Sequence, residues 1–182
     1  MKKLIQSDAF KNFGSSVIAI LIGLLIGAVV IFISNSGEAL NGLRTLLAGP
    51  IEDGMLGIGR VLYYAVPIIM TGLSVGFAFK TGLFNIGTPG QFIVGAFAAV
   101  YIGVKWTFLP GSIHWLVAIL GAFVAGGLWA VIPGVMKAYL NVNEVISSIM
   151  MNYIGMYLVN YSVSLVLFDA LRNQSLPVAS TA

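Results

Sequence analysis

Five long apolar runs constrain this 182-residue chain more than any other feature of its sequence. They cover residues 17–34, 61–79, 88–104, 114–136 and 145–168. A helix that crosses a bilayer needs about 20 predominantly apolar residues, and each run is close to that length or exceeds it. Because 59% of the residues are hydrophobic and only 8% are charged, lipid must be the main solvent of the chain. The sequence predicts an all-α integral membrane protein with about five transmembrane helices and no β-sheet.

We expect residues 1–182 to form one transmembrane domain in the cytoplasmic membrane. Lys2 and Lys3 resemble the n-region of a signal peptide. The run that follows exceeds the 7–15 residues of an h-region, however, and no small-residue cleavage site follows it, so it is interpreted as an uncleaved span. Residues 43–51, LRTLLAGPI, are predicted either as a short helix along the membrane interface or as an exposed loop.

The N-terminus is expected on the cytoplasmic side, because cytoplasmic loops carry an excess of lysine and arginine. In that orientation the inner side holds one basic residue more than the outer side. The inner group is Lys2, Lys3, Lys11, Lys80 and Lys137, and the outer group is Arg44, Arg60, Lys105 and Arg172. The bias therefore favours a cytoplasmic N-terminus by a small margin.

Composition and motifs exclude several classes of function. The chain has no cysteine, so disulfide and thiolate sites are absent. Its net charge of +3 is spread thinly, without the basic cluster typical of nucleic-acid binding. The single histidine, His114, has no second histidine to pair with, and no catalytic or ATP-phosphate motif is present. We therefore predict no catalytic residue, metal site or cofactor, and we expect ATP hydrolysis from a separate subunit.

Polar and small residues form a stripe along the second apolar run. At 100° per residue they fall within an arc of about 80°. They are Tyr63, Pro67, Thr71, Ser74 and Ala78. Since polar groups at membrane depth usually face protein or a water-filled path, this face either lines a path for a solute or packs against another helix.

The fifth apolar run opens with NVNEVISSIMMNY. Asn143 is predicted to cap the helix, and Glu144 in its first turn is favoured by the helix dipole. One side of the helix carries polar or small residues that should face protein or water, namely Glu144, Ser147, Ser148, Asn152, Gly155 and Ser162. Of these we assign Ser148 and Asn152 to a solute path. Lys137, Asn143 and Glu144 either belong only to the helix ends or contact a cytoplasmic partner.

The segment GLFNIGTPGQ, residues 82–91, lies just before the third apolar run. Its three glycines permit tight backbone, and Thr88 is expected to cap the following helix with Pro89 at the first helical position. Asn85 and Gln91 place amides beside a helix N-terminus, an arrangement that many transporters use to hold a polar substrate. We expect this loop to pack into the protein, and we add Asn85 and Gln91 to the candidate solute path. An ordinary loop that starts a helix is the alternative.

Two motifs resemble those of a known family. TGLFNIGTPGQFIVGAFAA at Thr81–Ala99 and KAYLNVNEVISSIMMNYI at Lys137–Ile154 are similar to stretches in the permease subunits of bacterial ABC importers for nucleosides and simple sugars. Members of that family are roughly twice as long, so this chain resembles an N-terminal half. The sequence departs from the family at Thr88–Pro89, where Ala-Glu or a similar pair is common.

The resemblance implies several partners: a cytoplasmic ABC ATPase, a second permease subunit and an extracytoplasmic substrate-binding protein. It also implies that a nucleoside or a simple sugar crosses the membrane. A secondary transporter or channel is the alternative, although it would need an ion or proton site, and the candidate charges lie at the ends of the runs.

Overall fold

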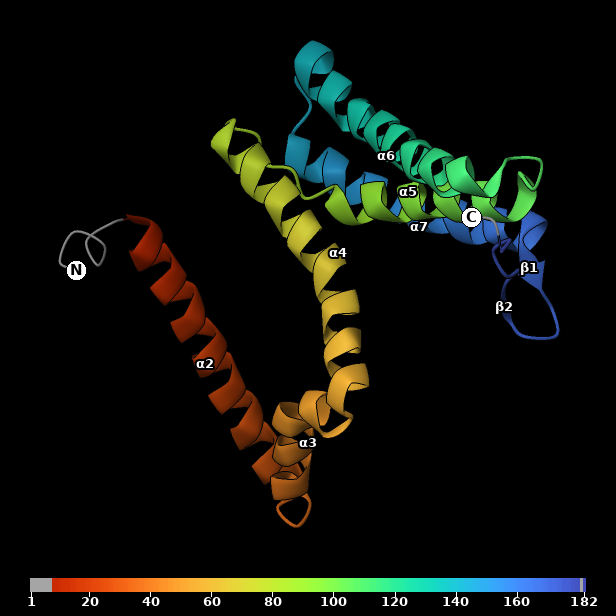
Figure 1. The fold of residues 1–182 in the computed structure, drawn as a ribbon. Coiled ribbons are helices and arrows are strands. Elements are labelled where there is room, and N and C mark those ends of the chain that lie inside the picture. The colour runs from red at the N-terminus through yellow and green to blue at the C-terminus, as the bar shows by residue number, and fades with distance from the viewer. Residues whose placement is uncertain (1–7, 181) are drawn as a thin grey trace. The chain divides into compact units, whose positions relative to one another are not determined.

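The computed structural model describes residues 8–180 and residue 182 (Figure 1). Lys2 and Lys3, on which the expected orientation partly depends, lie outside the described residues. The described part folds into six helices and one short hairpin, which agrees with the predicted all-α class. The elements are α2 (Asp8–Ser34), α3 (Ala39–Glu52), α4 (Gly54–Lys80), α5 (Thr88–Lys105), α6 (Gly111–Leu140), α7 (Glu144–Val166), β1 (Phe168–Asp169) and β2 (Gln174–Ser175).

The chain divides into two compact units, residues 1–66 and residues 67–182, which are described separately. In the first unit α2 begins at Asp8, earlier than the apolar run predicts. The hydroxyls of Ser15 and Ser16 donate to the carbonyls of Lys11 and Asn12, so these polar residues are satisfied within the helix and do not end it. Residues 43–51 are helical within α3, as one of the two predictions for them has it, and their place along the membrane interface stays a prediction.

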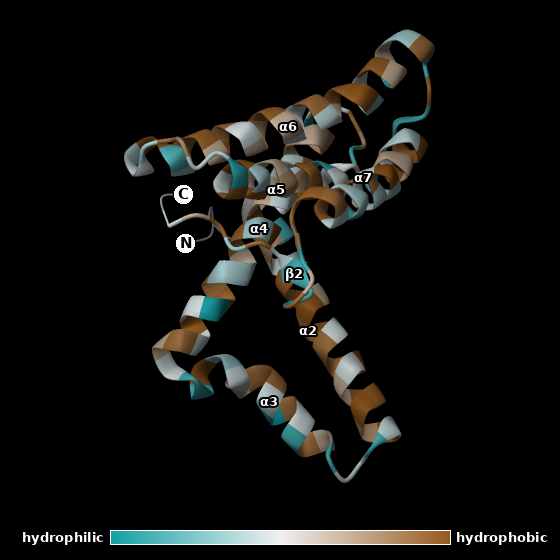
Figure 2. Cartoon of the chain, turned by 90° about the vertical axis from the view of Figure 1, so that its right-hand side faces the viewer, coloured by the Kyte–Doolittle hydropathy of each residue, from teal (hydrophilic) through white to brown (hydrophobic). Residues whose placement is uncertain are grey.

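Four of the described helices are long and apolar enough to cross a membrane. They are α4, α6, α7 and residues 11–34 of α2. Figure 2 shows mostly apolar residues along α2 and along much of α6. The third predicted span is the helix α5, whose bounds differ from the prediction by one residue. Its 18 residues rise about 27 Å. It opens with the polar sequence Thr-Pro-Gly-Gln and is not one of the four.

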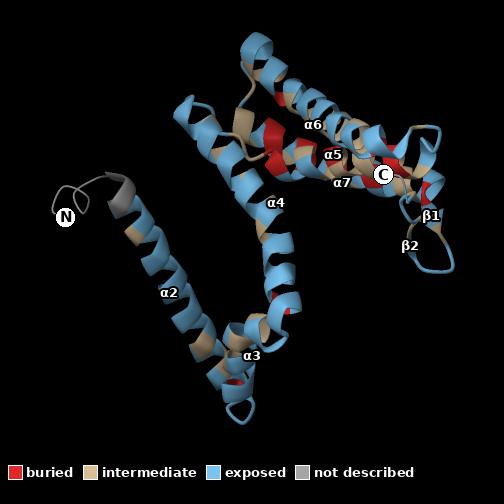
Figure 3. Ribbon diagram, in the orientation of Figure 1, coloured by how far each residue is buried: buried red, intermediate tan, exposed pale blue. Residues whose placement is uncertain are grey.

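The second unit has its core where α5 packs against α6 and α7 (Figure 3). Glycines allow the close approach of α5 and α6. A Cβ on Gly95 would lie 3.0 Å from the Ala122 carbonyl oxygen, and one on Gly126 would lie 3.1 Å from that of Gln91. The predicted inward side of α7 is confirmed, since Ser147, Ser148 and Gly155 are buried.

The end of α7 corrects one prediction. The helix stops at Val166, and residues 168–175 form a two-stranded antiparallel hairpin instead of continuing the span. The polar sequence DALRNQ favours a turn, and the Asp169 carboxylate accepts a hydrogen bond from the Leu171 amide at 3.0 Å. The expectation of no β-structure is therefore wrong for these few residues.

Candidate functional site

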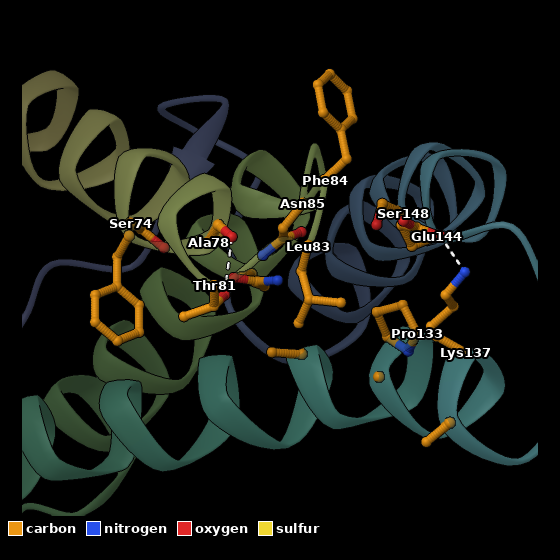
Figure 4. Close-up of a pocket in the computed structure, with 15 residues that line it drawn as sticks. Ser74, Ala78, Thr81, Leu83, Phe84, Asn85, Pro133, Lys137, Glu144 and Ser148 are labelled. Carbon is orange, nitrogen blue, oxygen red and sulfur yellow. Dashed lines mark hydrogen bonds and ion pairs between the residues drawn. The ribbon is translucent and has the colours of Figure 1, made fainter.

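A cavity of about 570 Å³ opens in the second unit, where α4 and α6 end and α5 and α7 begin (Figure 4). The loop between α4 and α5 forms one of its walls. Side chains of the four helices and of this loop line it: Ser74, Phe77, Ala78, Thr81, Leu83, Phe84, Asn85, Gln91, Ala130, Pro133, Gly134, Lys137, Ala138, Glu144 and Ser148. A cavity of this size suits a small organic molecule.

The loop is fixed to α7 by one amide side chain. Asn152 Nδ2 donates to the Ile86 carbonyl oxygen at 2.9 Å, and Asn152 Oδ1 accepts from the Gly90 amide at 2.9 Å. We call these two hydrogen bonds the Asn152 clamp. Both polar ends of the side chain are used within the protein. Asn152 does not line the cavity, so its geometry favours a role in folding over the solute contact predicted for it.

Close packing at the clamp requires glycine. A Cβ on Gly90 would lie 2.8 Å from Asn152 Oδ1 and 2.9 Å from Asn152 Cα, closer than real Cβ atoms come. A Cβ on Gly87 would lie 2.9 Å from Asn85 Oδ1. The prediction that the loop packs into the protein is confirmed for residues 85–88 and 90, which are buried or half-buried. It is wrong for Gly82, Leu83, Phe84 and Pro89, which are exposed.

The start of α5 differs from its prediction. Gly87 occupies the N-cap position, and Thr88 is already helical. Thr88 is 5% exposed, and its hydroxyl oxygen has no hydrogen-bond partner among the described residues. Local sequence does not predict this, because a threonine before Pro-Gly favours a capping role for the hydroxyl.

Asn85 turns the backbone into α5 and also faces the cavity. Its Oδ1 accepts a hydrogen bond from the Gly87 amide at 2.8 Å. Its Nδ2, the amide of Gln91 and the hydroxyl of Ser148 form no hydrogen bond with any described residue. Figure 4 shows Asn85 between the end of α4 and Ser148. We call Asn85, Gln91 and Ser148 the cavity triad.

An ion pair lies on the rim of the same cavity. Lys137 Nζ, in the last turn of α6, is 2.9 Å from Glu144 Oε2, in the first turn of α7 (Figure 4). The turn between the helices passes through Asn141 at φ 50°. Asn143 caps α7 as predicted, because its side chain accepts from the amides of Val145 and Ile146. Lys137 and Glu144 line the cavity, and Asn143 does not.

The predicted stripe on α4 reaches the cavity at one end only. Ser74 and Ala78 line it, whereas Tyr63, which belongs to the first unit, and Thr71 do not. The Thr71 hydroxyl donates to the Pro67 carbonyl oxygen at 2.8 Å, so its own helix satisfies it. The residues predicted for the solute path are Tyr63, Thr71, Ser74, Asn85, Gln91, Ser148 and Asn152. Of these, Ser74, Asn85, Gln91 and Ser148 line the cavity.

Sequence reasoning missed the surface that α6 contributes. Ala130, Pro133, Gly134 and Ala138 lie on one face of the helix and border the cavity. Their spacing of three, one and four residues places them together on a helix, and this signal could have been found. In a run this apolar, however, small residues also occur for helix packing, so the spacing alone does not identify a site.

Residues 57–180 match the protein family described as the permease component of the branched-chain amino acid transport system. The match covers more than half of the chain and includes both motifs quoted above. The chain belongs to this permease family. The resemblance to importer permeases expected from the sequence is confirmed, and the chain is a multi-pass protein of the cytoplasmic membrane.

The chain is also similar to three curated permeases. The chain is 45% identical over 152 residues to a guanosine ABC transporter permease of Bacillus subtilis, covering 84% of this chain and 43% of the relative. It is 33% identical to a glucose ABC transporter permease of Haloferax volcanii, covering 84% and 40%. It is 31% identical to a nucleoside ABC transporter permease of Lactococcus lactis, covering 77% and 38%. The chain thus spans about two fifths of the length of these relatives. No solved structure matches it.

Proposed function

We propose that this chain is a permease subunit of an ATP-driven ABC importer and that it helps to move a nucleoside or a simple sugar across the cytoplasmic membrane. The observation that carries the proposal is the 45% identity to a guanosine permease over most of the chain. Because another relative is a glucose ABC transporter permease, the proposed solutes include simple sugars. The cavity supports the proposal because it offers neutral hydrogen-bonding groups to a small polar solute.

Four of the predicted residues are proposed to contact the solute: Ser74, Asn85, Gln91 and Ser148. They line one cavity and come from α4, α5, α7 and the loop before α5. Hydrogen bonds to a neutral solute contribute about 0.5–1.5 kcal/mol each, so no single residue of this set should be indispensable. Tyr63, Thr71 and Asn152 are left outside the proposed contact set because they do not line the cavity.

The proposed transport needs partners. The sequence has no G-x-x-x-x-G-K-[ST] loop to bind ATP phosphates, so an ABC ATPase would supply the energy. A second permease subunit would complete the path, and an extracytoplasmic binding protein would deliver the solute. With a cytoplasmic N-terminus and α5 counted as a fifth span, the turn that joins α6 to α7 lies on the cytoplasmic side. Lys137, Asn143 and Glu144 are accordingly proposed to contact the ATPase.

Reconstitution tests this function. The chain is placed in proteoliposomes with its ATPase and second permease subunit, and radiolabelled guanosine and glucose are offered in separate experiments. Uptake of at least one solute should require both ATP and the ATPase, and a non-hydrolysable ATP analogue should stop it. The chain alone should neither hydrolyse ATP nor accumulate solute. Accumulation by the chain alone under an ion gradient would instead identify a secondary transporter.

A further inference from the structure

The cavity triad presents hydrogen-bonding groups that the protein itself does not use. Ser148 lines the cavity although it is only 2% exposed, and its hydroxyl bonds to no described residue. Asn85 Nδ2 and the Gln91 amide also lack partners among the described residues. These groups are open to hydrogen bonds from a molecule in the cavity, so a solute with matching donors and acceptors would be favoured at this place.

The cavity offers these groups without net charge. Its charged lining residues are Lys137 and Glu144, and they neutralise each other at 2.9 Å. The charged groups of a phosphorylated solute or of an amino acid zwitterion would find a partner of opposite charge only if this ion pair opened. The charge arrangement therefore favours a neutral solute, even though the family is described by amino acid transport.

The lining that α6 contributes over residues 130–138 is small and, apart from Lys137, apolar. Besides Lys137, four residues of α6 line the cavity, Ala130, Pro133, Gly134 and Ala138, and none of them carries a long side chain. A Cβ built on Gly134 would meet no atom within 4 Å, so open space lies above this part of the helix. The ring of Phe77 adds a further apolar surface to the cavity. A planar ring can lie on such a surface, whereas the hydroxyls on both faces of a sugar would meet no partner there.

We propose that this cavity binds the heterocyclic base of a nucleoside, with the base face on α6 and the base edge toward Asn85, Gln91 and Ser148. A primary amide carries a donor and an acceptor side by side, which is the pattern by which asparagine and glutamine recognise base edges. The inference rests on the proposed function and narrows it from nucleoside or sugar to solutes that carry a base.

Equilibrium binding tests this inference. The full chain is placed in lipid nanodiscs, and binding of radiolabelled guanosine is measured in competition with guanine, ribose and leucine. Guanine should displace the label, whereas ribose and leucine should not. Gln91→Leu should weaken guanosine binding roughly tenfold, because the amide contacts to the base edge are lost. Its thermal unfolding should be unchanged, because the Gln91 side chain bonds to no described residue.

Gln174→Leu is the matched control. Gln174 lies in β2, is exposed and does not line the cavity, so this variant should bind guanosine like the unaltered chain. Displacement by ribose and not by guanine, wild-type affinity in Gln91→Leu, or no guanosine binding at all would each overturn the inference. If ATP-dependent uptake of guanosine or glucose persists in that case, only the inference fails. If guanine binds and ATP-dependent uptake is absent, the proposed function fails.

Discussion

The Asn152 clamp and the cavity triad lie at the same helix ends and contain the same kinds of polar group, but they use those groups differently. The two ends of the Asn152 amide bond to the backbone of Ile86 and Gly90. The triad leaves the Asn85 Nδ2, the Gln91 amide and the Ser148 hydroxyl unpaired among the described residues. The polar groups at these helix ends thus divide into those that bond within the fold and those that are left for another molecule.

This difference predicts two classes of substitution, one that lowers stability and one that lowers solute affinity. Changes at the clamp should lower stability, and any loss of transport should follow from that loss. Changes in the triad should lower solute affinity and leave stability unaltered. A triad variant that unfolds, or a clamp variant that stays stable and loses solute affinity, would show that the two groups do not have these separate roles.

Gly90→Val should have the largest effect on stability. A Cβ at this position would lie 2.8 Å from Asn152 Oδ1 and 3.1 Å from the Met151 carbonyl oxygen, and backbone cannot move aside easily. Overpacking of this kind costs about 1–3 kcal/mol, and here the hydrogen bonds of the clamp are strained as well. We expect the detergent-purified variant to unfold at a much lower temperature or to fail to accumulate in the membrane.

Gly127→Ala is the control for that change. A Cβ on Gly127, in the middle of α6, would meet no atom within 4 Å. Alanine in a helix interior is more favourable than glycine by roughly 0.5–1 kcal/mol, so this variant should be at least as stable as the unaltered chain. Equal destabilisation of both variants would show that the helices tolerate no added methyl group, and the clamp would have no special role.

Asn152→Leu should have the next largest effect. The change removes the clamp and leaves the Gly90 amide and the Ile86 carbonyl without their partner. A buried polar group left unpaired costs about 1–3 kcal/mol, so the unfolding temperature should fall clearly. Asn160→Leu, an exposed amide on the same helix, should change stability by about 0.5 kcal/mol or less. Unchanged unfolding of Asn152→Leu together with weaker solute binding would move Asn152 into the solute site.

Local signals in the sequence predicted much of this fold. The apolar run 88–104 corresponds to α5 within one residue, and the Asn143 cap is correct, because both depend on neighbouring residues only. The partners of Asn152 lie 62 and 66 residues away in sequence, so no local pattern could identify them. The stripe on α4 had the right periodicity, yet periodicity could not tell that Thr71 would bond to its own helix.

Thr88→Val should have the smallest effect, and it tests where the boundary between the two groups lies. Thr88 resembles the triad in having an unpaired hydroxyl, but it lies outside the cavity lining and is 5% exposed. Valine has nearly the same shape, and it removes a buried oxygen that has no described partner. We therefore expect stability to rise by about 1 kcal/mol, as measured by thermal unfolding. Guanosine binding should not change, because the hydroxyl does not reach the cavity. Lower stability would mean that the hydroxyl bonds to a water molecule or another subunit. Weaker binding at unchanged stability would place Thr88 with the triad, and the solute site would then extend along the first turn of α5.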